Sequence, residues 1–370
     1  MKGKEQTHIA PKKKMSWEQN VRTVVPYTPG EQPNRPGMIK LNTNECPYPP
    51  APEVSEALKG FDSTRCRLYP DPQAAKLVEA LAQYYKVDKE QVFVGVGSDD
   101  VLAMAFLTFF NNKEKPILFP DITYSFYDVW AELYRIPYER QPLDDNFRIV
   151  SEDYKKPNGG VIFPNPNAPT GAFLELDQVE EIIKANPDVV VIVDEAYVDF
   201  GGKSVIPFVD KYDNLLVVQT FSKSRAMAGM RIGFAIGSKK LIQYLNDVKF
   251  SFNSYTMDHV TIETGVCAIK NDVYFREIVD KIVKTRERVS VRMRELGFQF
   301  EPSTTNFLFV THPDYSAVEI QDMLRSHDVY VRHFNGERIS NYLRITIGTD
   351  DEMDRLLELL ENYIKQEGNN

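Results

Sequence analysis

Residues 188–197 read Asp-Val-Val-Val-Ile-Val-Asp-Glu-Ala-Tyr, an apolar run of strand length that ends in two acids. An apolar run without polar alternation is typical of a strand that is covered on both faces of a parallel sheet. Open α/β sheets bind their ligands at the carboxyl ends of such strands. This stretch therefore predicts an α/β fold with Asp194 at a ligand site.

Similar short apolar runs recur from about residue 75 to 250, at Gln91–Val94, Pro116–Phe119, Val161–Phe163, Leu215–Val218 and Gly233–Ile236. Amphipathic stretches of helical period lie between the runs, at Ala74–Tyr85, Asp99–Phe110 and Asp177–Ala185. Alternation of buried strands and amphipathic helices indicates a mostly parallel central sheet flanked by helices.

The pattern changes after about residue 250. A long charged amphipathic stretch, Val273–Leu296, comes first, and shorter elements follow it. We expect strands at Asn306–Val310, Val329–Arg332 and Tyr342–Ile347, and helices at Ala317–His327 and Asp350–Gln366. These predict three parts: an N-terminal arm over residues 1–40, rich in proline, a large domain over 41–250, and a smaller α+β domain over 251–370.

The composition excludes several classes of protein. The 370 residues carry a net charge of −9, which argues against nucleic acid as a partner. No apolar run approaches the roughly 20 residues that span a bilayer, and the basic first 16 residues lack the apolar core of a signal peptide. We expect a cytoplasmic protein without a membrane partner, whose early lysine cluster (Lys2, Lys4, Lys12, Lys13, Lys14) is a solvated arm. The five scattered histidines predict no protein-bound metal.

A lysine follows another of the apolar runs. Lys223 lies in Thr-Phe-Ser-Lys-Ser-Arg-Ala-Met-Ala-Gly-Met-Arg, residues 220–231, in which Ser222 and Arg231 can both bind a phosphate group. A lysine amine forms a Schiff base with pyridoxal phosphate (PLP), and a carboxylate keeps the pyridine nitrogen protonated so that the ring can accept electrons. Lys223 and Asp194 together therefore predict a PLP enzyme, in which Tyr197 could donate to the ring's phenolic oxygen.

A second phosphate-binding feature follows the first strand. Gly95-Val-Gly97-Ser98-Asp99-Asp100 is a glycine turn that opens a helix, and helix N-termini present free N–H groups to anions. The alternative is an ordinary turn capped by Ser98 or Asp99, because the full dinucleotide-binding glycine pattern is absent.

The chain resembles the PLP-dependent aminotransferases of fold type I and, within them, the histidinol-phosphate aminotransferases. The resemblance covers about residues 21–363 and rests on ten separate motifs. They are Tyr27-Thr-Pro-Gly-Glu31, Leu41-Asn-Thr-Asn-Glu45, Leu68-Tyr-Pro-Asp71, Gly97-Ser-Asp-Asp100, Pro120-Asp-Ile-Thr-Tyr124, Asn165-Pro-Asn-Ala-Pro-Thr-Gly171, Asp194-Glu-Ala-Tyr197, Ser222-Lys223, Val331-Arg-His-Phe334 and Tyr342-Leu-Arg-Ile-Thr-Ile-Gly348.

The resemblance implies a role for each residue around the cofactor. Lys223 would bind PLP covalently and move protons as general base and acid, with Asp194 at the pyridine nitrogen. The other cofactor-binding residues implied are Ser98, Asp99, Tyr124, Tyr197, Ser222 and Arg231. Tyr69 would reach the cofactor of the neighbouring subunit, so the active unit would be a homodimer.

One family position departs from the pattern. The family often has an asparagine directly before the proline of this loop, where the sequence has Ala168. Asn167 could take over its bond to the ring oxygen, although a shift of one residue in an extended segment turns the side chain elsewhere. A turn residue between two prolines is the alternative interpretation of Asn167.

The resemblance places Arg332 and Arg344 at the substrate phosphate, assisted by Tyr27, with Asn44 also at the substrate. Alternation in 342–347 puts Arg344 opposite the packed face formed by Leu343 and Ile345. A rim salt bridge is the alternative for Arg332. The implied reaction is transamination between L-histidinol phosphate and 2-oxoglutarate in histidine biosynthesis. Two alternatives stay open: an aromatic or broad-specificity aminotransferase, and a PLP-dependent phosphoamino-acid decarboxylase.

Overall fold

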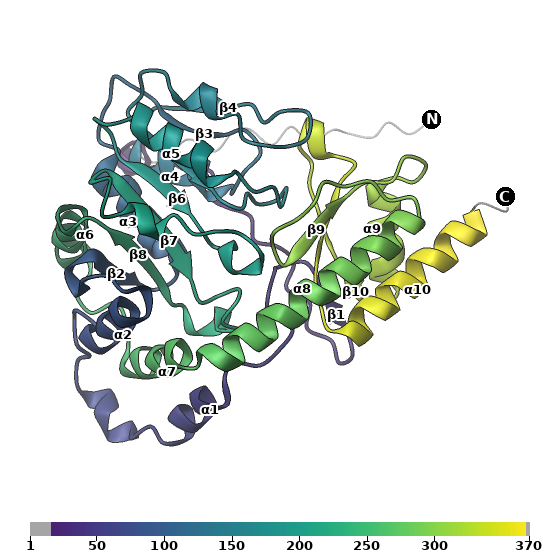
Figure 1. The fold of residues 1–370 in the computed structure, drawn as a ribbon, viewed down its shortest axis with the longest axis horizontal. Helices are drawn as coiled ribbons and strands as arrows, with labels where there is room; N and C mark the ends of the chain where they lie inside the picture. The colour runs from purple at the N-terminus through teal and green to yellow at the C-terminus, as the bar shows by residue number, and fades with distance from the viewer. Residues whose placement is uncertain (1–15, 368–370) are drawn as a thin grey trace.

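The computed structural model describes residues 16–367, so the lysine cluster of residues 2–14 lies outside the described residues. A large domain and a smaller one lie side by side, as Figure 1 shows, and the helix α8 (Asp272–Glu295) runs from one to the other. No helix among residues 16–367 is long and apolar enough to cross a membrane.

The large domain is built on a seven-stranded sheet. Its strands, in spatial order, are β2 (Val92–Gly95), β8 (Gly233–Gly237), β7 (Leu215–Thr220), β6 (Val191–Asp194), β5 (Gly160–Pro164), β3 (Ile117–Pro120) and β4 (Tyr138–Gln141). Every pair is parallel except the two that involve β8, which is antiparallel to both of its neighbours. The predicted fold class, a mostly parallel sheet flanked by helices, is confirmed.

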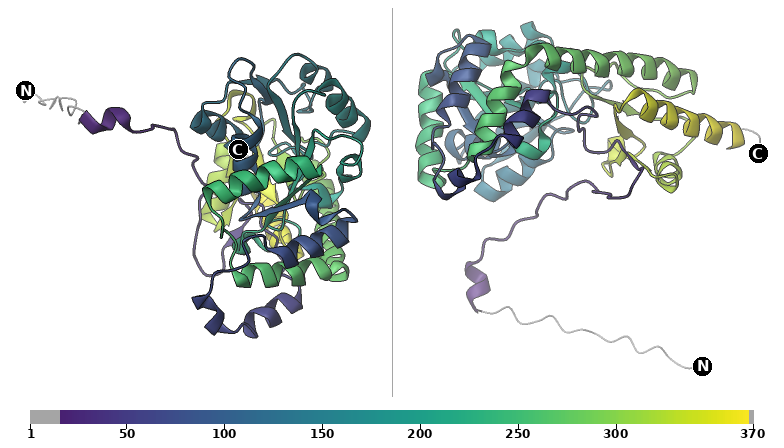
Figure 2. Two further views of the ribbon diagram at one scale, coloured as in Figure 1. Left: turned by 90° about the vertical axis from the view of Figure 1, so that its left-hand side faces the viewer. Right: turned by 90° about the horizontal axis from the view of Figure 1, so that it is seen from below.

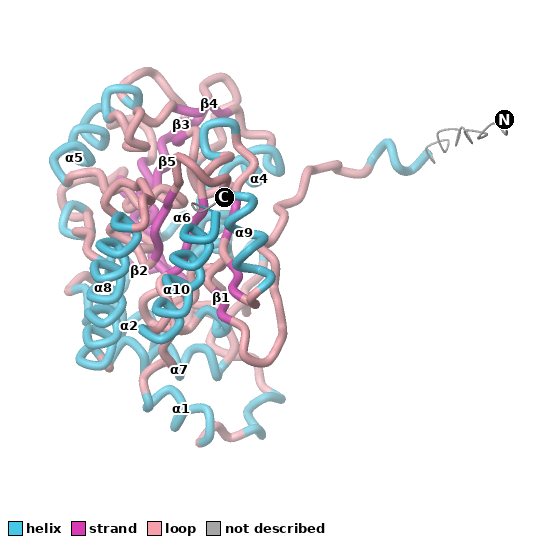
Figure 3. The backbone as a smooth tube through the Cα atoms, turned by 90° about the vertical axis from the view of Figure 1, so that its right-hand side faces the viewer, coloured by secondary structure: helices cyan, strands magenta, loops and turns pink. Residues whose placement is uncertain are grey.

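Helices cover both faces of this sheet, as the strands and helices of Figure 3 show. Alternate residues of one strand enter different cores: Phe163 of β5 packs with the core on one face, and Ile162 packs with the core on the other. The first core is closed by α1 (Pro52–Lys59), α2 (Ala75–Tyr85), α5 (Leu176–Ala185) and α7 (His259–Lys270), and the second by α3 (Ser98–Phe109), α4 (Phe126–Tyr134) and α6 (Lys239–Phe252). Burial of both faces explains why the strands lack polar alternation.

The small domain combines two short sheets with three helices. One sheet is antiparallel, in the order β11 (Arg332–His333), β12 (Leu343–Thr346), β9 (Phe307–Val310), and the other is the parallel pair β1 (Ile39–Lys40) and β10 (Val329–Tyr330). The helices are α8, α9 (Ala317–Ser326) and α10 (Asp350–Glu367). The single strand expected at Val329–Arg332 is thus divided between the two sheets, because β10 pairs with the arm and β11 pairs with β12.

The domain boundary expected near residue 250 stays a prediction. Beyond it, α7 packs into the core of the large sheet through Ile262 and Ile269. The following helix, α8, places Ile282 and Val289 in the core of the small domain. This packing favours a boundary within α8.

The segment before β1 is extended. Residues 21–38 contain no helix or strand, and Figure 2 shows the chain leaving the rest of the molecule. Val25 is 85% exposed, whereas Tyr27 stacks on Phe126 of α4 with ring centroids 4.2 Å apart. Tyr27 therefore joins the arm to the large domain.

Candidate active site

Lys223 and Asp194 line the same cavity at the carboxyl ends of neighbouring strands. Asp194 is the last residue of β6 and pairs in register with Val218 of β7, five residues before Lys223. The cavity has a volume of about 170 Å³. Eight predicted site residues line it: Ser98, Asp99, Tyr124, Asp194, Tyr197, Ser222, Lys223 and Arg231.

The Asp194 carboxyl is buried, with only 4% of the residue exposed. Its Oδ2 accepts a 2.9 Å hydrogen bond from the Tyr127 hydroxyl, and its Oδ1 accepts one of 3.2 Å from the Ala196 N–H. Burial raises the pKa of Asp194 to about 6. Within residues 16–367 no lysine, arginine or histidine forms an ion pair with it, so a bound cation would stabilise its charged form. No sequence pattern pointed to Tyr127, whose hydroxyl reaches Asp194 from α4.

The Lys223 amine lies between two segments of the cavity wall. Its Nζ donates a 3.3 Å hydrogen bond to the Thr43 carbonyl and lies 5.8 Å from the centroid of the Tyr197 ring. The Tyr197 hydroxyl accepts a 2.8 Å hydrogen bond from Asn44 Nδ2. Because that bond uses an acceptor site, the hydroxyl proton of Tyr197 can be donated to a ligand.

The turn that opens α3 packs tightly against the neighbouring strand. A Cβ atom on Gly233 would lie 2.2 Å from the backbone N of Ser98, so only glycine allows this approach. The Asp99 carboxylate forms a 3.1 Å ion pair with Arg231, and it accepts a 2.7 Å hydrogen bond from the Tyr124 hydroxyl. Asp100 turns back to accept from the Val96 N–H at 3.0 Å. Both carboxylates of the first turn are thus held by their own partners.

A second cavity of about 290 Å³ adjoins the first and shares Lys223, Tyr124 and Tyr197 with it. The four predicted substrate-binding residues line it: Tyr27, Asn44, Arg332 and Arg344. The rings of Phe126 and Phe334 also line it; neither was singled out from the sequence. Cationic groups and aromatic walls together suit an anionic substrate with a planar ring.

Arg344 is the more buried of the two arginines. Its Nη2 donates a 3.0 Å hydrogen bond to the Asn42 carbonyl, while its buried Nε has no hydrogen-bond partner in the described part of the chain. Burial lowers the pKa of Arg344, and the nearby charge of Arg332 acts in the same direction. Neither arginine forms an ion pair with an acid among residues 16–367. The rim salt bridge considered for Arg332 is therefore absent from the described part of the chain.

Asn167 lies outside both cavities, and Ala168 lines both. The Asn167 amide donates to the Ile122 carbonyl at 2.9 Å and to Thr170 Oγ1 at 3.0 Å. One N–H donor is therefore used inside the loop and the other on the segment before α4, so the structure does not bring Asn167 to the position expected for it. Its contacts agree with the alternative interpretation, a residue that holds the turn.

Tyr69 also lies outside the cavities of its own chain. It is 80% exposed and stacks on Tyr255 with ring centroids 4.6 Å apart. This placement leaves its ring accessible to another molecule.

The comparison with family models decides the class of protein. The model described as "Aminotransferase class I and II" matches residues 36–360. The chain belongs to this family.

Relatives agree with that assignment. The aminotransferase is 52% identical over 344 residues to a protein of Clostridium beijerinckii named histidinol-phosphate aminotransferase, covering 93% of this chain and 96% of that one. It is 49% identical over 351 residues to the protein of the same name from Lactococcus lactis, covering 95% and 98%. The fold is shared with histidinol-phosphate aminotransferase from Sinorhizobium meliloti in complex with pyridoxal 5′-phosphate, at a TM-score of 0.81 and 23% identity, covering 89% and 91%.

The cofactor of the aminotransferase is pyridoxal 5′-phosphate. The described residues fit this group. The buried Asp194 carboxyl forms no ion pair with a cationic side chain of residues 16–367, and a pyridinium nitrogen would supply a cation in contact with it. The glycine turn, Ser222 and Arg231 offer backbone N–H, hydroxyl and guanidinium donors to a phosphate. The Lys223 amine lines the cavity that also contains the Asp194 carboxyl and these phosphate-binding donors.

Proposed function

We propose that this aminotransferase exchanges the amino group of L-histidinol phosphate with 2-oxoglutarate, giving imidazole-acetol phosphate and glutamate, in histidine biosynthesis. The observation that carries the proposal is the facing pair of Arg332 and Arg344, which have no acid partner in the described chain and line a cavity with aromatic walls. A phosphate or carboxylate is the natural partner of such a pair. The names of the relatives at about 50% identity support this substrate.

Each of the eight predicted site residues that line the first cavity, called the cofactor cavity from here on, has a proposed role. PLP, when bound, supplies the electron sink for the chemistry at the substrate's amine-bearing carbon. Asp194 holds the proton on the pyridine nitrogen, and Tyr197 donates its hydroxyl proton to the ring oxygen. The Lys223 amine moves the proton at the reacting carbon as general base and acid. Tyr124 would pack on the ring, and the cofactor phosphate would be held by backbone N–H groups near Ser98 and Asp99 together with Ser222 and Arg231.

The second cavity accepts two anionic substrates in turn. Arg332 and Arg344 bind the phosphate of histidinol phosphate and then the carboxylates of 2-oxoglutarate, with Tyr27 assisting from the arm and Asn44 from the loop after β1. Phe126 and Phe334 flank the imidazole ring. Because one cavity serves both substrates, ping-pong kinetics are expected.

The proposed active unit is a cytoplasmic homodimer in which Tyr69 of each subunit completes the cofactor cavity of the other. The exposure of Tyr69, stacked on Tyr255, supports this arrangement. Exposed apolar side chains of the arm and of α6, among them Trp17, Val25 and Phe252, also favour a partner surface.

Visible absorption of the purified protein tests the reaction. We expect a cofactor band that bleaches when L-histidinol phosphate is added and returns with 2-oxoglutarate, and that is lost in Lys223→Ala. Comparison of kcat/KM then separates the alternatives. A preference for phenylalanine would indicate an aromatic aminotransferase, and release of CO₂ without need for 2-oxoglutarate would indicate a decarboxylase.

A further inference from the structure

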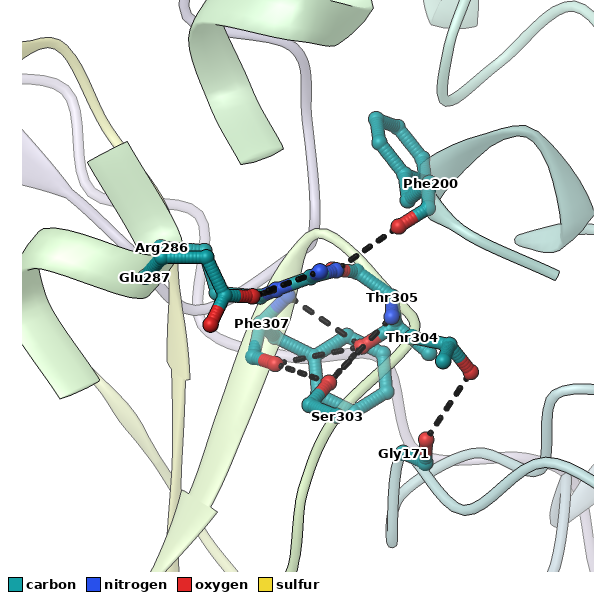
Figure 4. Close-up of polar contacts among 8 residues, drawn as sticks. All are labelled: Gly171, Phe200, Arg286, Glu287, Ser303, Thr304, Thr305 and Phe307. Atoms are coloured by element: carbon teal, nitrogen blue, oxygen red, sulfur yellow. Dashed lines mark hydrogen bonds and ion pairs between the residues drawn. The ribbon is translucent and has the colours of Figure 1, made fainter. Parts of the chain in front are cut away.

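One loop of the small domain contacts three chain segments, each of which also carries residues that line the cofactor cavity. These residues, 303–307, are called the junction loop here, although the last of them begins β9, and Figure 4 shows part of their surroundings. The Thr304 N–H donates to the Gly171 carbonyl at 3.1 Å, three residues beyond Ala168. Asn306 Nδ2 donates to the Asn44 carbonyl at 3.0 Å. The third contact runs through an arginine of α8.

Arg286 links the junction loop to the segment that carries Tyr197. Its Nη1 donates to the Phe200 carbonyl at 2.8 Å and to the Thr305 carbonyl at 2.7 Å. A dashed line in Figure 4 marks the bond to Phe200. The residue is only 5% exposed, and Glu287 on the same helix accepts from its Nε and Nη2. Removal of this guanidinium would leave two buried carbonyl groups without their donor.

These contacts close a ring of hydrogen bonds around Tyr197. This closed series of hydrogen bonds starts at the Phe200 carbonyl and passes through Arg286 to the junction loop. From there Asn306 donates to the Asn44 carbonyl. The series returns through Asn44 Nδ2 to the Tyr197 hydroxyl at 2.8 Å. The Tyr197 ring also packs edge-on against Phe307 of the same loop, with centroids 5.2 Å apart. Tyr197 is therefore held through its backbone at one end and through its hydroxyl at the other.

We propose that Arg286 is a positioning residue for the reaction. It orients the Tyr197 hydroxyl toward the cofactor's ring oxygen. The proposal rests on the role of Tyr197 stated above. A hydrogen bond weakens steeply as its angle departs from linear, so a small shift of residues 197–200 changes the bond to the cofactor. Arg286 lines neither cavity and acts only through the ring of contacts.

The test compares holoenzyme variants by the pH midpoint of the cofactor's visible band and by kcat. The charged groups that line the cofactor cavity with Tyr197 are Lys223, Asp194, Asp99, Glu45 and Arg231, and Arg286→Met alters none of them. We expect Arg286→Met to move the midpoint in the same direction as Tyr197→Phe and to lower kcat about 10- to 100-fold. Arg286→Lys, which keeps a donor, should recover part of both effects. The exposed Arg292→Met on the same helix is the matched control and should change neither.

A double variant tests whether Arg286 acts on the cofactor through Tyr197. If Arg286 acts through Tyr197, adding Arg286→Met to Tyr197→Phe shifts the midpoint no further. Additive shifts would overturn the proposal, as would an unshifted midpoint in Arg286→Met. Asn306→Ala breaks the ring at another link and should move the midpoint likewise, which provides the test if Arg286→Met does not fold. If Tyr197→Phe itself leaves the band unchanged, the assigned role of Tyr197 fails instead.

Discussion

Arg332 of β11 and Arg344 of β12 are direct partners across an antiparallel strand pair, and both line the cavity next to Lys223. Two like charges in this position repel each other, and burial adds to the cost of charging Arg344. A bound dianion offsets both effects. The pair therefore favours a phosphate ester over a neutral side chain.

Replacing Arg332 by glutamine should lower kcat/KM more for the phosphorylated substrate than for a substrate without phosphate. A charge-assisted hydrogen bond contributes about 1.5–3 kcal/mol, so we expect kcat/KM for histidinol phosphate to fall roughly 10- to 100-fold. Steady-state kinetics with histidinol phosphate and with phenylalanine measure this. Arg338→Gln is the matched control, because Arg338 already pairs with Asp121 at 3.1 Å. An equal loss for both donors in Arg332→Gln would contradict phosphate recognition.

The buried carboxyl of Asp194 should make the stability of the cofactor-free protein depend on pH. Burial raises its folded-state pKa from 3.8 to about 6, so the folded state binds more protons than the unfolded state between these values. The contribution of Asp194 to stability therefore falls as the pH rises from about 4 to 6. Asp194→Asn should be more stable than the wild type by roughly 2–3 kcal/mol at pH 8, with no such gain at pH 4.

Urea unfolding at both pH values, with and without PLP, checks this expectation. Bound PLP supplies a cation to Asp194, so the order of stability at pH 8 should reverse when the cofactor is present. A gain for Asp194→Asn that persists in the presence of PLP would mean that the carboxyl does not face the pyridine nitrogen.

Gly233→Ala should weaken cofactor binding through the phosphate turn. The new Cβ would lie 2.2 Å from backbone atoms of Gly97 and Ser98, so the turn must move. We expect the Kd for PLP to rise on the order of 100-fold, measured by equilibrium titration, because the turn no longer presents its N–H groups correctly. Gly229→Ala is the control, since no atom of the described residues lies within 4 Å of a Cβ there. Equal affinities in the two variants would argue against phosphate binding at the turn.

Mixing two inactive variants tests the shared site. Lys223→Ala lacks the amine, and Tyr69→Ala lacks the ring that we propose to enter the partner's cavity. In a mixed dimer one site carries both intact residues, so random exchange of subunits should restore about a quarter of the wild-type activity. Activity assays after dissociation and reassociation measure this. No recovery, with mixed dimers verified by mass, would place Tyr69 outside the partner's site.

The sequence predicted the central elements well because burial on both faces leaves a plain apolar run. The strands β5, β6 and β7 each coincide with such a run, and their ends give Asp194 and the segment leading to Lys223. Strand β4 was missed because it is an edge strand with the polar sequence Tyr-Glu-Arg-Gln. The pairing of β1 with β10 was missed as well, since two residues carry no periodic signal.

The placement of a site residue was predictable where it follows from the position of that residue on a strand. Arg344 is an example, because alternation along its strand separates it from the packed Leu343 and Ile345. Tyr127 was not found, since its bond to Asp194 depends on how α4 packs on the sheet. Asn167 was assigned by analogy, and its hydrogen bonds to Thr170 in the same loop and to Ile122 on another segment direct its amide elsewhere.

The continuous helix α8 constrains how the two domains can move. Its first turns pack with α7 on the large domain, and its later turns fill the small-domain core with Ile282 and Val289. A rigid rod that is anchored at both ends cannot act as a loosely folded hinge. Any closure over a substrate must then proceed by sliding and tilting of packed side chains, a shear motion of small amplitude.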